Sequence, residues 1–135
     1  MKSMRPVEKR FMQYVKIDTQ SDERSESCPS TTKQRDFAKV LIQDLTDIGM
    51  KDISLDSHGY IMATLPSNVT TNLPVIGFIA HMDTSPDMSG AGVKPEIIKN
   101  YNGENIVLEK EQNVILSPAD FPALNRNCEK LTHFP

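Results

Sequence analysis

The stretch VIGFIAHMDTSPD, from Val75 to Asp87, decides how the fold of this chain is interpreted. Its first six residues form a continuous apolar run, which is typical of a strand covered on both faces in the interior of a sheet. Polar residues follow at once, so the strand is expected to end at Ala80 and to deliver His81 to its carboxyl end. Ligand sites in open α/β sheets gather at such ends. The stretch therefore predicts a buried strand with a candidate site directly after it.

Two side chains of this stretch, His81 and Asp83, have the spacing of a metal ligand and its support. In extended backbone, residues i and i+2 point to the same side, so the two can be neighbours. A neutral imidazole binds a divalent metal through one nitrogen, and a carboxylate that accepts from the other ring N–H fixes the tautomer. Short motifs also occur by chance, and a histidine at this place can simply end a strand or satisfy a loop. The spacing alone leaves both interpretations open.

Upstream of the apolar run, the spacing of the apolar residues is helical. We expect helices from about Val7 to Ile17 and from Thr32 to Ile48, each with one apolar stripe. Thr31 and Gln34 have the spacing of a capping box at the start of the second helix, and Gly49 supplies its stop. The sequence therefore predicts two amphipathic surface helices.

Strand signals follow the helices. Ile53 and Leu55 alternate with polar residues, His58-Gly59 sits at a turn, and residues 60–65 are expected to form the second strand of a hairpin. Residues 105–108 and 114–116 are further short strand candidates. Helices, hairpin and buried strand together predict an α/β fold.

Composition sets outer limits on function. The chain has 135 residues, enough for about one domain, and its 38% hydrophobic and 24% charged residues are typical of a globular protein. Its 15 basic residues are scattered and outnumbered by 18 acidic ones, so nucleic acid is not an expected partner. The longest apolar run is too short to span a bilayer and no signal peptide is evident, so no membrane partner and a cytoplasmic location are expected. Cys28 and Cys128 are far apart and are expected to be reduced thiols, with a single disulfide between them as the alternative that the sequence leaves open.

The surroundings of the HMD triplet resemble the M20 (aminoacylase-like) metallopeptidase family, and within it the tripeptide aminopeptidases. The likeness rests on HMDTSPD after VIGFIA and on the segments YVKIDTQS, HGYIMATLPSN and NYNGENIVL, and it runs from about residue 7 to 124. It implies an incomplete α/β fold, the amino-terminal part of a zinc-peptidase-like α/β sandwich with a mixed sheet. Residues 1–124 would be the amino-terminal part of the catalytic domain, residues 125–135 a divergent tail, and the lid or dimerisation domain would be absent.

The same resemblance implies roles for the two motif residues. His81 would ligate one zinc of a two-zinc site, and Asp83 would be the residue described as catalytic because it orients and tunes that histidine. The substrates would be short peptides, chiefly tripeptides, from which a metallo-aminopeptidase releases the amino-terminal residue. Any homodimer would require the full-length protein.

The family pattern is incomplete in this chain. The later Gly-Ala-Asp-Asp and Glu-Glu type motifs, which supply a bridging carboxylate, a further ligand and the general base, have no counterpart here. A catalytic zinc normally needs three protein ligands, so we expect the isolated fragment to be inactive. The alternative is a non-catalytic truncated product or a pseudo-subunit of such an enzyme.

Other candidate residues carry weaker signals. His58 lies in the predicted turn, where a histidine is usually exposed, and Asp87 beside Pro86 is better explained as a turn former. His133 lies in the divergent tail and receives no role.

Overall fold

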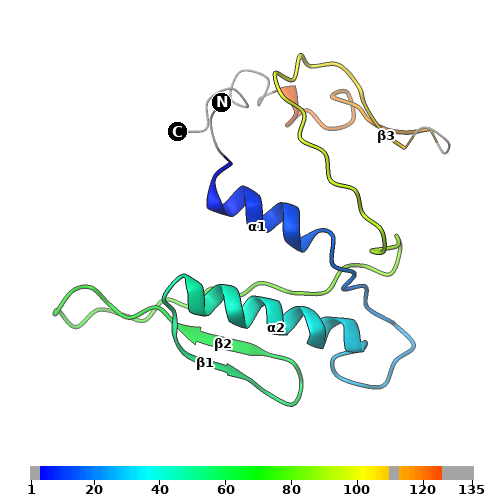
Figure 1. Ribbon diagram of the computed structural model, residues 1–135. Coiled ribbons are helices and arrows are strands. Elements are labelled where there is room, and N and C mark those ends of the chain that lie inside the picture. Colours follow the sequence, from blue (N-terminus) through cyan, green and yellow to red (C-terminus); the bar gives the residue numbers. More distant parts are fainter. Residues whose placement is uncertain (1–3, 110–112, 126–135) are drawn as a thin grey trace. The chain divides into compact units, whose positions relative to one another are not determined.

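The computed structural model describes residues 4–109 and 113–125, and the chain divides into two compact units, one ending at Pro95 and the other beginning at Glu96. The mixed α/β class is confirmed, with two helices and two small antiparallel sheets in the described ranges (Figure 1). Neither of the described helices has the length and apolar character needed to cross a membrane. The elements are α1 (Pro6–Tyr14), α2 (Thr32–Asp47), β1 (Lys51–Leu55), β2 (Ile61–Thr64), β3 (Ile106–Glu109) and β4 (Val114–Leu116).

Helix α1 begins where its proline predicts. Pro6 occupies the first turn, where its missing N–H costs no hydrogen bond. The Glu8 carboxylate accepts from the Arg5 backbone N–H at 2.7 Å and from Arg5 Nε at 2.8 Å, which fixes the first turn. The helix ends at Tyr14, earlier than expected, because the Ile17 N–H donates to the Tyr14 carbonyl three residues back. The first helix is confirmed with a shorter carboxyl end.

Helix α2 has its predicted bounds to within one residue, but the predicted capping hydrogen bonds at its first turn are not formed. The Thr31 hydroxyl donates to the Gln20 carbonyl at 3.2 Å instead of capping the helix, and Gln34 Nε2 donates to Ser30 Oγ at 3.2 Å. The predicted capping box is therefore wrong, because both side chains are used by the preceding segment. Gly49 has φ of +89° and ends the helix as predicted.

The predicted hairpin is confirmed by β1 and β2, which pair antiparallel with one irregularity in register. Its turn is organised by Asp56, whose Oδ1 accepts from the backbone N–H groups of His58 at 2.9 Å and Tyr60 at 2.8 Å. Gly59 has φ of +89°, a conformation that favours glycine. A short polar side chain and one glycine thus close the hairpin.

The core of the first unit lies where α2 packs on the β1–β2 hairpin (Figure 1). Phe37 and Ala38 of α2 are buried, with Phe37 only 7% exposed. The Tyr14 ring meets Phe37 edge-to-face, with centroids 5.2 Å apart and planes at 78°. The Tyr14 hydroxyl donates to Asp44 Oδ2 at 2.5 Å. One aromatic side chain therefore joins the end of α1 to α2.

The second unit contains the antiparallel pair β3 and β4, which confirms both short strands predicted there. Tyr101, which precedes β3 in the sequence, is buried, and its hydroxyl donates to the Glu104 carbonyl at 2.6 Å. After β4, the Phe121 N–H donates to the Ser117 carbonyl at 2.9 Å, which forms a tight turn.

The apolar run from Val75 to Ala80 departs from the prediction. It has no assigned helix or strand, and Phe78 is 94% exposed. The predicted buried strand is wrong for this chain, because a strand covered on both faces needs strand neighbours. Neither two-stranded sheet in the described residues includes the run.

Candidate metal site

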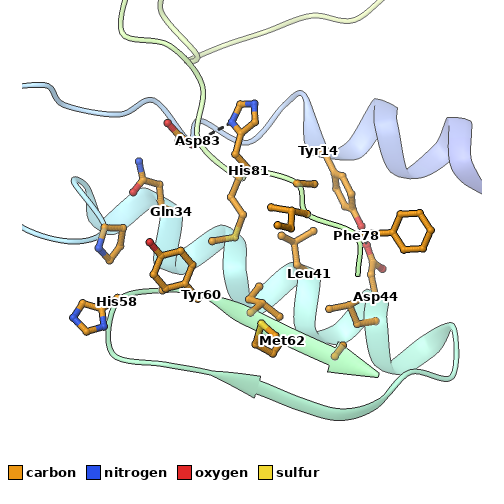
Figure 2. A pocket seen from close by; sticks show the side chains of 18 of the residues that line it. Tyr14, Gln34, Leu41, Asp44, His58, Tyr60, Met62, Phe78, His81 and Asp83 are labelled. Atoms are coloured by element: carbon orange, nitrogen blue, oxygen red, sulfur yellow. Dashed lines mark hydrogen bonds and ion pairs between the residues drawn. The ribbon is translucent and has the colours of Figure 1, made fainter. Parts of the chain in front are cut away.

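The site begins with a contact between His81 and Asp83. His81 Nδ1 lies 3.2 Å from Asp83 Oδ1, and the two side chains point toward one another (Figure 2). The His81 side chain is 85% exposed and that of Asp83 is 46% exposed. The proximity predicted from their i, i+2 spacing is therefore present. Their chemical roles stay predictions.

The contact has a direct consequence for the imidazole. If Asp83 accepts the Nδ1–H, the lone pair of the neutral ring is on Nε2, which is the nitrogen available to a metal. Across the part of the chain that the structure describes, no group of three or more His, Cys, Asp or Glu side chains is arranged to hold a metal ion. The pair therefore amounts to one supported ligand rather than a complete metal site.

A short backbone bridge follows the pair. The Thr84 N–H donates to the Thr19 carbonyl at 3.3 Å, and the Ser21 N–H donates to the Thr84 carbonyl at 3.0 Å. These bonds form a parallel bridge between Gln20 and Thr84. The backbone is thus anchored one residue after Asp83.

The pair lies at one side of an apolar groove of about 980 Å³. The groove is bordered by the end of α1, by α2, by β2 and by residues 78–83. Its polar side chains include Tyr14 and Asp44 (Figure 2). Burial and the hydrogen bond to Asp44 raise the pKa of Tyr14 to about 12. The proton shared between Tyr14 and Asp44 therefore stays on the Tyr14 phenol.

Two other polar candidates serve as turn residues. His58 lies in the hairpin turn, with Nδ1 3.8 Å from Asp56 Oδ2. Asp87 accepts from the Ser85 hydroxyl at 2.6 Å, and its N–H donates to the same oxygen at 3.2 Å. Both arrangements agree with the turn roles predicted for these residues.

The remaining candidates are partly outside the described residues. Cys28 is an exposed free thiol, as expected, and its Sγ donates to the His58 carbonyl at 3.5 Å. His133 and Cys128 of the divergent tail lie outside the described ranges.

The geometry of the pair does not identify the family of the chain, but similarity to known proteins bears on it. No protein-family model matches the chain. Three curated relatives named peptidase T align with it, at 54% identity over 121 residues in Clostridium acetobutylicum, 55% over 127 in Halothermothrix orenii and 56% over 129 in Alkaliphilus oremlandii. This chain is homologous to part of peptidase T. The alignments cover 90 to 94% of the chain but only 30 to 32% of these peptidase T sequences.

The peptidase T match covers the His81–Asp83 pair together with most of the chain's secondary structure. The chain is therefore homologous to a hydrolase of peptide bonds, in agreement with the resemblance found from HMDTSPD. Because the chain spans about three tenths of peptidase T, the activity of the whole enzyme comes to it only as a proposal.

Proposed function

We propose that this chain carries part of the catalytic domain of a zinc-dependent tripeptide aminopeptidase of the M20 family. In this proposal His81 binds one of two zinc ions and Asp83 holds the imidazole in the binding tautomer. The observation that carries the proposal is the 3.2 Å contact between His81 Nδ1 and Asp83 Oδ1 in a chain about 55% identical to peptidase T.

The donor set fits zinc in kind but not in number. An imidazole supported by a carboxylate is a typical zinc ligand, whereas a catalytic zinc takes three protein ligands. A bound zinc pair would polarise the scissile carbonyl of a short peptide and lower the pKa of a water. Within this chain, His81 would bind and Asp83 would accept the Nδ1 proton. We therefore expect the isolated chain to be inactive, with the bridging carboxylate and general base supplied elsewhere in the complete enzyme.

The finer fold is part of the same proposal. We expect residues 1–124 to belong to an α/β sandwich with a mixed sheet in the complete enzyme, and residues 125–135 to be divergent. The enzyme is expected to act as a cytoplasmic peptidase, and any homodimer would require its full length. The exposure of the apolar side chains of Val75 and Phe78 supports the idea that this run gains neighbours there.

A chimeric enzyme tests the function directly. Residues 1–124 would replace the matching stretch in the peptidase T of Alkaliphilus oremlandii. Zinc content and release of the amino-terminal residue from a tripeptide would be measured. His81→Ala should lower zinc occupancy and abolish activity, because a ligand is deleted. Asp83→Asn should cost about 10–100-fold in zinc affinity or activity, the usual loss for a residue that supports a metal ligand.

His58→Ala is the matched control, because His58 belongs to the hairpin turn; it should leave both measurements unchanged. Unchanged turnover and zinc affinity in Asp83→Asn would contradict the supporting role. Zinc-dependent hydrolysis by the isolated chain would contradict its predicted inactivity. A folded but inactive chimera beside an active parent enzyme would favour the alternative, a non-catalytic product or pseudo-subunit.

A further inference from the structure

The segment Asp18–Ser21, between α1 and α2, contacts the chain just after the His81–Asp83 pair. Thr84 is its main backbone partner: the Thr84 N–H donates to Thr19, and the Thr84 carbonyl accepts from the Ser21 N–H at 3.0 Å and the Ser21 hydroxyl at 3.1 Å. Thr19 is 3% exposed, so the bridge is shielded on this side. Segments more than 60 residues apart are thereby joined one position beyond Asp83.

Gln20 extends this attachment along the following turn. Its side-chain Nε2 donates to the Pro86 carbonyl at 2.9 Å and to the Met88 carbonyl at 3.1 Å. A primary amide has two N–H donors, so both are used. The Gln20 backbone is itself held, because its N–H donates to Asp18 Oδ1 and its carbonyl accepts from the Thr31 hydroxyl. One glutamine therefore links the turn to the start of α2.

Asp18 closes the arrangement against Gly90. Asp18 Oδ2 lies 2.6 Å from Lys33 Nζ, and the hydrogen bonds from Lys33 and from the Gln20 N–H hold the Asp18 pKa below its usual range. A Cβ at position 90 would lie 2.9 Å from Asp18 Oδ1 and 3.3 Å from Thr84 Oγ1. A side chain at position 90 would therefore require the Asp18 carboxylate to shift from the place where Lys33 and the Gln20 N–H hold it.

We propose that Asp18, Gln20 and Gly90 form a clamp that positions the His81–Asp83 pair, with Gln20 as its central positioning residue. Residues 75–80, directly before His81, have no assigned helix or strand, so the direction of the pair depends on how the chain is held after Asp83. Five hydrogen bonds join the segment Asp18–Ser21 to Thr84, Pro86 and Met88, and two of them come from the Gln20 side-chain amide. The proposal rests on the proposed function, because the pair is taken to bind zinc.

The test uses the chimeric enzyme described above. Gln20→Ala removes both donors, so we expect zinc affinity to fall about 10-fold, at the low end of the usual loss for residues that support a ligand. Saturating zinc should restore kcat. Gln20→Glu keeps the shape but cannot donate, and it should fail to rescue affinity. Gln43→Ala is the matched control, because Gln43 Nε2 donates only to Asp47 Oδ1 within α2, and zinc affinity should stay unchanged.

A second variant tests the close approach of Asp18 to Gly90. Gly90→Ala should also weaken zinc binding, whereas Gly77→Ala should not, because a Cβ at position 77 meets nothing within 4 Å. Combining Gly90→Ala with Asp18→Ala removes the clashing carboxylate. The combined loss should therefore be smaller than the sum of the two single losses. Strict additivity would contradict the close approach of Asp18 to Gly90.

Amide hydrogen exchange in the 135-residue chain separates the clamp from the zinc site. Gln20→Ala should speed exchange at the Thr84 and Ser21 amides, and His81→Ala should not. If His81→Ala lowers zinc affinity in the chimera while Gln20→Ala leaves both affinity and exchange unchanged, the clamp alone is overturned. If neither substitution affects zinc, the proposed function fails and the clamp's role falls with it.

Discussion

Helix α2 and the run Val75–Ala80 are both rich in apolar side chains, but they end in opposite environments. Phe37 of α2 is buried and meets the Tyr14 ring edge-to-face, whereas Phe78 is almost fully exposed. The partners of α2 lie within about 30 residues of it, in α1 and in the β1–β2 hairpin. An apolar pattern is therefore buried only when the chain brings a packing partner to it.

Two matched substitutions, one in α2 and one in the exposed run, should differ strongly in their effect on stability. Phe37→Ala should lower the free energy of unfolding by about 3 kcal/mol, because it leaves a cavity and deletes the edge-to-face contact with Tyr14. Phe78→Ala should change it by less than about 0.5 kcal/mol, the usual range for surface substitutions. Urea unfolding of the 135-residue chain measures both.

The same pair of variants also tests the proposed fold of the complete enzyme. In the chimera, Phe78→Ala should become as costly as Phe37→Ala if the run gains strand neighbours there. Equal losses in the isolated chain would break the comparison, because Phe78 would then be buried in solution.

The locally encoded parts of the fold were predictable from sequence. Helical spacing located α1 and α2, and alternation with a turn located the β1–β2 hairpin, because both signals depend on residues close in the chain. The exposed, unassigned state of Val75–Ala80 was not predictable, because an apolar run indicates that a segment would suit a sheet interior but not whether neighbouring strands are present.

The candidate site shows the same division. The His81–Asp83 contact follows from i, i+2 spacing, so it could be expected from sequence. The clamp could not, because Gln20 reaches Pro86 and Met88 across more than 60 residues and no spacing rule connects them. The capping box predicted for α2 is missing for the same reason: the Thr31 hydroxyl donates to the Gln20 carbonyl, a partner outside its own helix.

A smaller effect compares glycines from the two regions. Gly59, in the hairpin turn, has φ of +89°, and a Cβ there would lie 3.3 Å from the Pro29 ring. Gly59→Ala should therefore cost about 1–2 kcal/mol of unfolding free energy through backbone strain. Gly77→Ala in the exposed run should cost almost nothing, because its Cβ meets no atom within 4 Å. Thermal unfolding of both variants checks this, and equal midpoints would show that the turn is not held as described.

The smallest effect concerns the contact that attaches α1 to α2. Tyr14→Phe removes the hydrogen bond to Asp44 while keeping the ring against Phe37, so the loss should be about 1 kcal/mol at neutral pH. The pKa of Tyr14 is raised from its ordinary 10.0 to about 12 in the folded chain, so folding favours the protonated phenol. Its contribution is complete below pH 10 and is lost as the pH rises toward 12.

Unfolding free energy measured between pH 9 and 12 should therefore fall more steeply in the unsubstituted chain than in Tyr14→Phe. Tyr60→Phe is the control, because Tyr60 is 65% exposed and its loss should leave the pH dependence unchanged. A Tyr14→Phe chain with the original slope would mean that the phenol is hydrated in the folded state. The buried core of the first unit would then include Phe37 but not Tyr14 at the end of α1.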